Sequence, residues 1–419
     1  MDEESRKEAM GAASAKSRCS LFPPSFEPWR AEEPDRAVAV LMSGGVDSSV
    51  AALLLKQAGW DAVGITMKIP MVETYSRPRL CCGVEAALVC RALDLPHYVV
   101  DVAEVFRASV IEPFRRAYAE GCTPSPCVDC NTFVKFQAVW DILERELGVR
   151  RVATGHYARV IQEGARTVLA RGRDVERDQS YFIYGVPRER LERLLLPLGD
   201  WEKERVRATA REQHLEVAER ADSMEICFAG EGDYRNALGE AARPSPGPIV
   251  DVDGNVLGRH RGIGHYTVGQ RRGLGIAAPQ PLYVLRVDAG RNTLVVGTRR
   301  QAYGSLVRAR RLNALLPDAL DVGVRLFGKI RSIGEPAPCT VVDARADELA
   351  VRFEPPVFAP APGQHLVLYD LNGRVVGGGA IRTDSLSERE EEDDGPNEPL
   401  VARLADARIG GNGESPGRA

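Results

Sequence analysis

Three cysteines in this sequence are spaced in a way that could support metal or sulfur chemistry. Cys127 and Cys130 form a Cys-x-x-Cys pair directly after Pro124 and Pro126, which impose an extended, rigid entry into a helix. A helix N-terminus lowers the pKa of a cysteine, and paired thiolates are ligands for metals and clusters. Cys227 lies much further along the chain, in the segment DSMEICF. On its own, Cys227 is more simply interpreted as a buried apolar cysteine, so its part in such a site stays open at this point.

The cysteine content also bears on the cellular compartment. The sequence holds nine cysteines, has no apolar run of membrane-spanning length and starts with a segment too polar for a signal peptide. We therefore expect a cytoplasmic protein without a membrane partner. In that reducing compartment, closely spaced cysteines indicate metal, sulfur or catalytic chemistry rather than a framework of structural disulfides.

A second chemical feature is the loop SGGVDSS at residues 43–49, which separates a short apolar run from a helix-like apolar pattern. Its two glycines let the backbone approach an anion closely, while its serine hydroxyls and the N–H groups of a helix start supply hydrogen-bond donors. The loop lacks the Lys-Ser/Thr ending of a Walker A motif, so it contains no lysine to neutralise a γ-phosphate. We expect a phosphate site here; the alternative is a glycine-rich turn that binds no ligand.

Alternating strand-like and helix-like segments must position this loop. Such alternation predicts an α/β domain in which helices cover a parallel sheet. After residue 290, short alternating runs separated by Gly, Pro and Asp turns predict a small antiparallel β-barrel. In the first domain, the strand-like segments are 37–42, 61–67, 97–102 and 150–157, and the helix-like segments are 49–59, 85–95 and 135–148.

These patterns divide the chain into five parts. We expect a disordered N-terminal extension (1–35), a nucleotide-binding catalytic domain (36–200), a small central α/β domain (201–289), a C-terminal antiparallel β-barrel (290–383) and a disordered acidic tail (384–419). The tail holds ten acidic and four basic residues and the extension holds eight and five, so the body between them is basic. A basic body suits a nucleic-acid partner, although an arginine-rich composition alone explains it about as well.

Several motifs together resemble one known family. SGGVDSS resembles the PP-loop of the ATP pyrophosphatase superfamily, whose members release pyrophosphate and transfer AMP to an acceptor. Five further motifs follow it in the order found in the bacterial tRNA-specific 2-thiouridylases, the MnmA family, and the resemblance covers roughly residues 36–383. Other PP-loop enzymes share only the first motif. The five are TPSPCVDCNTFVKF, GHYAR at 155–159, RDQSYF at 177–182, DSMEICF at 222–228 and YTVGQRRGLGI at 266–276.

This resemblance implies ATP-dependent 2-thiolation of the wobble uridine of tRNA. The oxygen at carbon 2 of the uracil is first adenylated, so that AMP can leave when sulfur arrives, and the loop and Mg²⁺ help pyrophosphate to depart. Asp47 would take part in this catalysis, whereas Met67 beside the adenine is equally well explained as ordinary core. The resemblance places ATP on Leu41, Met42, Ser43, Gly44, Gly45, Val46, Asp47, Ser48, Met67 and Gly155.

The same resemblance offers two routes for the sulfur. In one branch of the family an Asp precedes the nucleophilic cysteine, and a persulfide on a distant cysteine attacks carbon 2; Cys130 and Cys227 match those two cysteines. In this chain, however, Cys127 stands at the Asp position. A second branch holds an iron–sulfur cluster on three cysteines, and we favour that cluster on Cys127, Cys130 and Cys227 over the persulfide route. The sulfur donor stays open among a persulfide relay protein, a cysteine desulfurase and inorganic sulfide.

Contacts to tRNA are implied in the same way. Ser125, Pro126 and Cys127 would face the flipped uracil, although the family usually has Asn at the position of Ser125. The family's Lys-Asp-Gln is Arg-Asp-Gln here, which keeps a phosphate-binding charge. The alternative is that the arginines are solvated surface charges. The implied tRNA-contacting residues are Ser125, Pro126, Cys127, His156, Arg177, Asp178, Gln179, Arg331, Ser332 and Gln364.

Two other functions share part of these features. Another PP-loop adenylating ligase or thiolase would have the same loop, and a metal-stabilised tRNA-binding module with a dead nucleotide site would have the cysteines and the barrel. The intact SGGVDSS favours an enzyme over the binding module. A ligase of the amidotransferase type is disfavoured because it would leave the C-terminal barrel and the three spaced cysteines unexplained.

Overall fold

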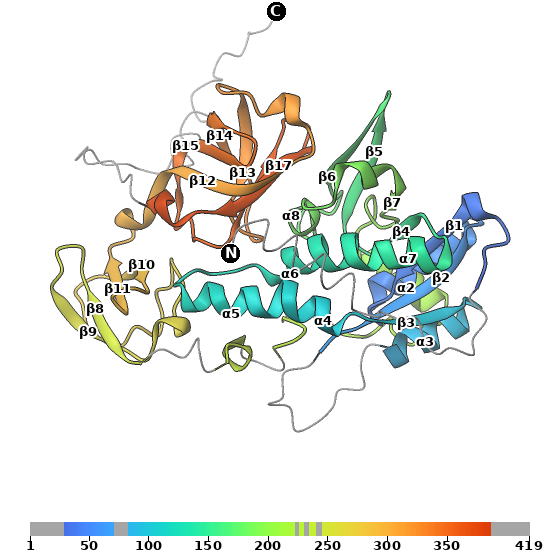
Figure 1. The fold of residues 1–419 in the computed structure, drawn as a ribbon, viewed down its shortest axis with the longest axis horizontal. Coiled ribbons are helices and arrows are strands. Elements are labelled where there is room, and N and C mark those ends of the chain that lie inside the picture. Colours follow the sequence, from blue (N-terminus) through green and yellow to red (C-terminus); the bar gives the residue numbers. More distant parts are fainter. Residues whose placement is uncertain (1–28, 71–82, 223–225, 230–233, 240–244, 387–419) are drawn as a thin grey trace, which may run out of the picture.

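The computed structural model describes residues 29–70, 83–222, 226–229, 234–239 and 245–386. The tail from residue 387 onward and residues 1–28 of the N-terminal extension lie outside these ranges, so the two predictions of disorder fall mainly on residues that are not described. Within the described ranges, no helix is both long and apolar enough to cross a membrane. Figure 1 shows three regions: a parallel sheet with its helices, a small sheet and a barrel.

The first region is built on a five-stranded parallel sheet with the order β3-β2-β1-β4-β7, which confirms the predicted parallel sheet. All five residues of the central strand β1 are buried, as expected of an apolar strand that is covered on both faces. The strands are β1 (Ala37–Leu41), β2 (Asp61–Lys68), β3 (His97–Asp101), β4 (Arg151–Ala153) and β7 (Leu194–Leu195).

Helices pack on both faces of this sheet. Successive residues of a strand point to opposite faces, so Val38 and Val40 of β1 join a buried cluster with α2, α3 and α9, whereas Ala39 and Leu41 join another with α4, α5 and α7. The phosphate loop therefore leaves a sheet that is fixed from two sides. The helices are α2 (Val46–Gln57), α3 (Gly83–Ala92), α4 (Ala103–Phe106), α5 (Glu112–Ala119), α7 (Trp140–Leu147) and α9 (Lys203–Glu212), with a π-helical turn, η2 (Arg107–Ile111), between α4 and α5.

One continuous helical stretch carries the Cys-x-x-Cys pair. It begins as α6 (Pro126–Asp129), continues as the π-helical segment η3 (Cys130–Val139) and ends with α7. Pro126 occupies the first helical position, where its fixed φ is already helical and a missing N–H breaks no helical bond. Gly148 ends the stretch with a left-handed φ of 68°. The two cysteines thus lie at the start of a helix, as the sequence predicts.

The other two regions are a four-stranded sheet and a closed barrel. The small sheet has the order β10-β11-β8-β9 and the barrel the order β12-β15-β14-β13-β16-β17, which confirms the predicted antiparallel barrel at the C-terminal end. The strands of the small sheet are β8 (Gly247–Val250), β9 (Val256–His260), β10 (Tyr283–Asp288) and β11 (Thr293–Gly297); those of the barrel are β12 (Tyr303–Ala314), β13 (Arg325–Lys329), β14 (Ala337–Ala344), β15 (Glu348–Phe358), β16 (His365–Tyr369) and β17 (Val375–Ile381).

Two elements lie in a different region from the one that the sequence pattern indicates. The range expected to form the central α/β domain (201–289) begins with α9, but Val206 and Ala210 of this helix pack into the parallel-sheet region beside α2. The run at residues 292–298, predicted as part of the barrel, forms β11, which pairs with β8 and β10 because Leu294 and Val296 pack into the small sheet's own core. Alternation identifies a strand but does not say which sheet it joins.

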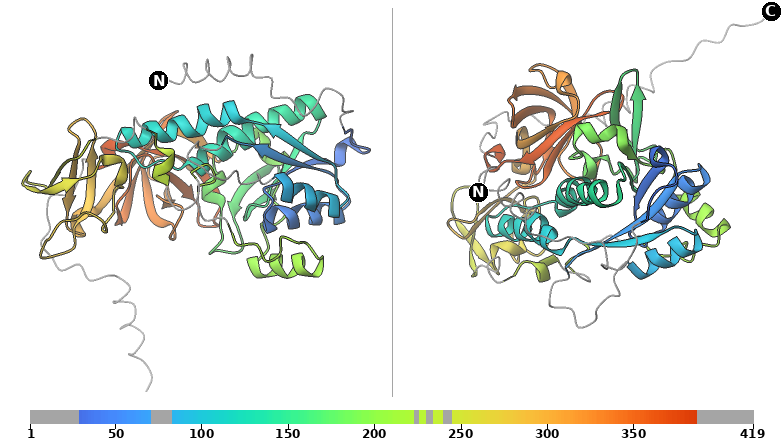
Figure 2. Two further views of the ribbon diagram at one scale, coloured as in Figure 1. Left: turned by 90° about the horizontal axis from the view of Figure 1, so that it is seen from below. Right: turned by 45° about the vertical axis from the view of Figure 1, so that its right-hand side comes forward.

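The barrel packs directly on the parallel-sheet region. Its residues Val367, Tyr369 and Val375 belong to the same buried cluster as Leu169 of the hairpin strand β6 and Tyr181 of the short helix α8. The two views in Figure 2 show this hairpin beside the barrel. The barrel is therefore part of the framework around the cysteine helix. The hairpin consists of β5 (Ala158–Glu163) and β6 (Arg166–Arg171), and α8 spans Ser180–Ile183.

Candidate active site

The predicted phosphate loop connects the end of β1 to the start of α2. Gly44 has a left-handed φ of 70°, a conformation that favours glycine. The hydroxyl of Ser48 donates to the carbonyl oxygen of Gly45 at 3.1 Å and accepts from the backbone N–H of Ser43 at 3.2 Å. The hydroxyl of Ser49 donates to the same Gly45 oxygen at 2.9 Å. These bonds hold the loop in a compact turn before the first helical residue, Val46.

Gly155 lies against this turn. A Cβ at position 155 would come within 2.7 Å of the backbone nitrogen of Ser48 and of the carbonyl carbon of Asp47, so a side chain cannot fit without a shift of the backbone. Leu41 and Met42 are buried, and Met67 is half-buried near the end of the neighbouring strand β2. The structure therefore brings the loop and Gly155 together, with Met67 one strand away.

A lysine that the loop sequence lacks is supplied by α9. The Nζ atom of Lys203 lies 2.8 Å from both carboxylate oxygens of Asp47, and the hydroxyl of Tyr157 donates to Asp47 Oδ1 at 2.7 Å. The side chain of Lys203 is only 10% exposed. The sequence analysis missed this residue because it lies in another element far along the chain, and no local motif links it to the loop.

Lys203 also pairs with Asp222, five positions before Cys227 in the same segment. Its Nζ lies 2.8 Å from Asp222 Oδ1, and Arg207 and Arg177 pair with the same carboxylate at 2.8 and 3.2 Å. Burial acts to raise the pKa of Asp222, but its hydrogen bond to Lys203 and the three positive charges outweigh this effect and lower the pKa. An ion-pair network thus links the phosphate loop to the segment that contains Cys227.

The two cysteines of the Cys-x-x-Cys pair differ in exposure but not in the direction of their pKa. Cys127 is exposed and Cys130 is buried. The surrounding protein withdraws the thiols from water and so raises the pKa of both, against the opposing charge of Lys135; this holds even for Cys127, whose residue as a whole is exposed. The pKa of Cys130 is raised to about 11. The expectation that the helix start makes both of them thiolates is therefore not met in this structure, because removal from water disfavours the charged form.

Cys227 is exposed and lies in a turn, so it is not the buried apolar cysteine that it resembles when taken alone. Its neighbour Phe228 anchors the turn by packing edge-to-face on Phe106 and Phe114, with ring centroids 5.7 and 5.3 Å away. In the part of the chain that the structure describes, no three His, Cys, Asp or Glu residues form a group that could hold a metal ion. The three motif cysteines therefore do not fit a cluster site in this arrangement.

The residues predicted to face the target base are only partly accessible. Ser125 and Pro126 are buried, whereas Cys127 is exposed beside them. His156 is half-buried, and its Nδ1 lies 2.8 Å from the hydroxyl of Thr154. Burial and the charge of Lys135 lower the pKa of His156 well below its usual value, so its ring is neutral at physiological pH.

The Arg-Asp-Gln motif is largely engaged within the protein. Asp178 is buried, and its carboxylate accepts hydrogen bonds from the backbone N–H of Gly172 and Ser180, the hydroxyl of Ser180 and Nε of Arg171, at 3.0 to 3.2 Å. The Asp178 side chain does not face solvent, whereas the predicted contact with tRNA needs an exposed side chain. Arg177 is exposed and pairs with Asp222. The side-chain oxygen of Gln179 accepts from the backbone N–H of Tyr157 at 3.0 Å.

The barrel residues for which a tRNA contact is implied also make hydrogen bonds within the protein or are partly buried. Arg331 is half-buried, donates to the carbonyl oxygen of Phe358 and lies over that ring at 5.8 Å. Ser332 is half-buried. The side-chain amide of Gln364 donates to the carbonyl oxygens of Thr123 and Pro124, just before the cysteine helix, at 3.0 and 3.2 Å.

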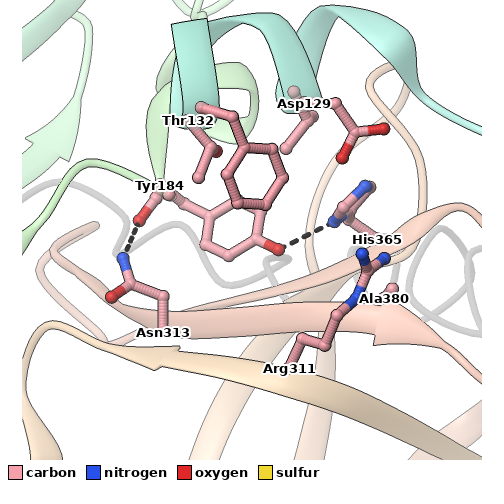
Figure 3. Close-up of a pocket in the computed structure, with 10 residues that line it drawn as sticks. Asp129, Thr132, Tyr184, Arg311, Asn313, His365 and Ala380 are labelled. Atoms are coloured by element: carbon pink, nitrogen blue, oxygen red, sulfur yellow. Dashed lines mark hydrogen bonds between the residues drawn. The ribbon is translucent and has the colours of Figure 1, made fainter. Parts of the chain in front are cut away.

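A cavity of about 50 Å³ lies where the cysteine helix meets the barrel (Figure 3). On its floor the hydroxyl of Tyr184 lies 2.7 Å from Nδ1 of His365, and Asn313 donates to the backbone oxygen of Tyr184 at 2.7 Å. Burial lowers the pKa of His365 to about 3, so this contact is between neutral groups. The cavity is lined by Val128, Asp129, Thr132, Phe133, Tyr184, Gly185, Arg311, Asn313, His365 and Ala380.

Comparison with known proteins gives consistent matches along the chain. Residues 36–231 match the family described as tRNA methyl transferase HUP domain, residues 235–298 the tRNA methyl transferase PRC-barrel domain, and residues 306–381 the aminomethyltransferase beta-barrel domain. The tRNA-specific 2-thiouridylase MnmA of Xanthobacter autotrophicus is 45% identical over 361 residues, which cover 82% of this chain and 92% of that protein. The MnmA of Acetivibrio thermocellus is 40% identical over 359 residues, which cover 83% and 99%.

A solved structure with a partly similar fold is the U34-tRNA thiolase NcsA from Methanococcus maripaludis with its 4Fe-4S cluster. It is 16% identical, has a TM-score of 0.31 and covers 56% of this chain and 72% of its own.

Proposed function

The chain belongs to the family of tRNA-specific 2-thiouridylases. We propose that it carries out the ATP-dependent 2-thiolation of a tRNA uridine, with separate groups of its residues serving the two halves of the reaction. The enzyme is a sulfurtransferase that modifies tRNA. We place its target at the wobble position and its activity in the cytoplasm, where tRNA is used. The reaction needs a nucleotide half, which activates the base, and a sulfur half, which replaces the oxygen.

The phosphate loop serves the nucleotide half. Backbone N–H groups at the start of α2 would bind the β- and γ-phosphates of ATP, and Gly155 leaves the backbone space that a side chain would fill. The carboxylate of Asp47 and the hydroxyl of Ser48 are oxygen donors of the kind that Mg²⁺ prefers, so the residues present fit that ion. When bound, magnesium would stabilise the departing pyrophosphate. Lys203 would supply the positive charge that the loop itself lacks.

Activation makes the base oxygen a leaving group. The oxygen at carbon 2 attacks the α-phosphorus of ATP, the bond to pyrophosphate breaks, and the base becomes adenylated. A sulfur nucleophile then adds to carbon 2, and AMP leaves with the former base oxygen. Donors of the loop and Lys203 stabilise the charge that develops on pyrophosphate in the first step, which is the usual main contribution of such a site.

The sulfur half uses Cys227 and Cys130 in our proposal. The terminal sulfur of a persulfide on Cys227 attacks carbon 2, and the thiolate of Cys130 then attacks the Cys227 sulfur, which breaks the S–S bond and leaves sulfur on the base. The product is a Cys130–Cys227 disulfide, which an external thiol reduces. Because the pKa of Cys130 is raised to about 11, a base or a bound cation must help remove its proton. In this route a persulfide protein or a cysteine desulfurase transfers its outer sulfur to the Cys227 thiolate and is left with its own thiol. Inorganic sulfide would need an oxidant to form the Cys227 persulfide, so it is a donor only for the cluster route.

The three-cysteine cluster does not fit the described arrangement, and we assign no step to it. The Cys127→Asp variant separates the routes. In the persulfide route, Cys127→Asp keeps activity in air with a persulfide donor, whereas Cys130→Ala and Cys227→Ala are inactive. Loss of activity in a folded, tRNA-binding Cys127→Asp variant, together with iron and sulfide in the anaerobically purified wild type, would instead establish the cluster.

The observation that carries the proposal is the contact of Lys203 and Gly155 with the phosphate loop in a chain of this family. The test is the Asp47→Ala variant, assayed for pyrophosphate release, thiolated tRNA and tRNA affinity. We expect both activities to be lost while tRNA affinity is kept, because the change is confined to the handling of phosphate and metal. Wild-type thiolation by Asp47→Ala would remove the loop from the mechanism.

A further inference from the structure

The barrel touches the segment that leads into the cysteine helix. We call residues 122–125 the entry loop and residues 361–364, directly before β16, the barrel loop. The side-chain Nε2 of Gln364 donates to the carbonyl oxygens of Thr123 and Pro124 at 3.0 and 3.2 Å, and the backbone N–H of Thr123 donates to the oxygen of Pro362 at 2.7 Å. Three hydrogen bonds thus join the two loops within a few residues.

The close approach of the loops depends on Gly363. This residue has a φ of +89°, and a Cβ there would lie 3.0 Å from the carbonyl oxygen of Thr123 and 3.1 Å from Cβ of Cys122. The barrel loop itself is fixed, because Gly363 N–H donates to the oxygen of Ile381 at 3.0 Å and Ile381 N–H donates to the oxygen of Gln364 at 2.7 Å. The contact is therefore made by a rigid part of the barrel.

The position of the entry loop determines where the cysteines lie. Ser125 follows the two bonded carbonyls, and its own carbonyl oxygen accepts from the N–H groups of Val128 and Asp129 at 3.0 and 3.3 Å, which closes the first turn of α6. Cys127 lies inside that turn and Cys130 directly after it. A displacement of the Thr123 and Pro124 carbonyls would change where the helix starts and where both thiols lie.

The hydrogen bonds also limit what else Gln364 can do. A side-chain amide has two N–H donors and one carbonyl acceptor, and here the nitrogen faces two carbonyl oxygens, an orientation that the opposite amide placement could not satisfy. Only the side-chain oxygen is left over. It can accept a hydrogen bond but cannot bind a phosphate, so Gln364 is poorly equipped for a backbone contact with tRNA.

We infer that Gln364 is a positioning residue for the catalytic cysteines, through which the C-terminal barrel sets the geometry of the entry loop. This inference rests on the proposed function of Cys130 and goes beyond the tRNA contact that the family resemblance implies for Gln364. The barrel then has two tasks, which are to meet the tRNA and to hold the sulfur half of the site in place.

The test uses two substitutions that keep the size of the side chain. Gln364→Met removes the two N–H donors. Gln364→Glu places a negatively charged acceptor against the two carbonyl oxygens, so we expect a larger effect from Gln364→Glu than from Gln364→Met. Gln162→Met, on the exposed hairpin, is the matched control because the hydrogen bonds of its amide, to Gly164 and from Thr167, stay within that hairpin. Each protein is assayed for tRNA affinity, pyrophosphate release, single-turnover thiolation at saturating tRNA, and the rate at which iodoacetamide alkylates Cys127 without tRNA or ATP. Thermal melting checks that each variant is folded.

For Gln364→Met we expect unchanged tRNA affinity and pyrophosphate release, a fall of about tenfold in single-turnover thiolation and a clear change in the alkylation rate of Cys127, because misplaced reacting groups lose rate rather than affinity. The control should match the wild type in all four assays. Weaker tRNA binding with normal thiolation at saturation would make Gln364 a tRNA contact and overturn the inference, as would wild-type alkylation and thiolation together. The alkylation assay needs no tRNA, ATP or sulfur donor, so its outcome is independent of whether the proposed function holds.

Discussion

The phosphate loop is contacted by residues from distant parts of the chain, whereas the three motif cysteines form no metal-holding group among the described residues. Gly155 contacts the backbone of Asp47 and Ser48, and Lys203 adds the missing charge. Cys127 and Cys130 share one helix start, but with Cys227 they form no metal-holding group among the described residues. The contacts around the phosphate loop are thus present in this structure, whereas the proposed sulfur transfer joins cysteines from two segments that lie far apart in the sequence.

This difference arises because the two sites are built from different parts of the chain. A phosphate loop is made by backbone N–H groups of consecutive residues, which the strand and the helix fix as soon as the sheet forms. The sulfur half joins side chains from separate segments, and both helix cysteines carry raised pKa values from burial. We expect perturbations of the nucleotide half to slow the release of pyrophosphate, and perturbations of the sulfur half to appear only in the later step, the transfer of sulfur.

Replacing Lys203 by Met should have the largest effect. It leaves the carboxylates of Asp47 and Asp222 without their shared cation and removes the charge expected to stabilise pyrophosphate. We expect pyrophosphate release to fall by about 100-fold or more, as for the loss of a preorganised donor. Lys56→Met, an exposed lysine on α2, is the control. Pyrophosphate release within twofold of the wild type would exclude Lys203 from the nucleotide half.

Gly155→Ala should have the next largest effect. Its Cβ would come within 2.7 Å of the backbone of the phosphate loop, so the loop must move. We expect kcat/KM for ATP in pyrophosphate release to fall by about 10- to 100-fold and stability to fall by about 1–3 kcal/mol from overpacking. Gly290→Ala serves as the control, because a Cβ there meets only Asp288 Oδ1, at 3.7 Å. Normal ATP kinetics in a folded Gly155→Ala variant would contradict this close contact.

The pH dependence of Cys130 sharpens the sulfur side of the comparison. Burial raises its pKa to about 11, so below that value its thiolate fraction should grow about tenfold for each pH unit. An ordinary cysteine levels off near pH 8.5. We therefore expect the alkylation rate of Cys130, followed by mass spectrometry, to keep rising above pH 9. If the alkylation rate instead levels off near neutral pH, Cys130 is already a thiolate at that pH, stabilised by the helix start or by a bound metal.

Arg331→Ala should have the smallest effect. Its guanidinium is half-buried and donates to Phe358, so only part of its charge is available to tRNA. We expect tRNA affinity to fall by a few-fold and the slope of log affinity against log salt to decrease by about one, with unchanged ATP affinity. The measurement is tRNA binding between low and moderate salt. An identical salt slope would remove Arg331 from the interface.

The parts of this molecule that depend on local pattern could be predicted from sequence. The loop at residues 43–49, the alternating apolar strands and the helix start at Pro126 are encoded by neighbouring residues, and the structure confirms them. Lys203 could not be found in this way, because its role depends on how α9 packs against α2. The burial of Asp178 has the same cause, since its motif includes Ser180 but not Arg171 and Gly172, which also donate hydrogen bonds to its carboxylate.

The pairing of Lys203 with two carboxylates has a thermodynamic consequence. Asp47 belongs to the phosphate loop and Asp222 to the DSMEICF motif, so any ligand that changes how Lys203 divides its bonds between them acts on both carboxylates. Coupling of this kind is reciprocal. If ATP alters the free energy of a given position of Cys227, then a sulfur donor that holds Cys227 there must alter the affinity for ATP by the same factor. One shared lysine would then make the affinity for nucleotide and the affinity for the sulfur donor depend on each other.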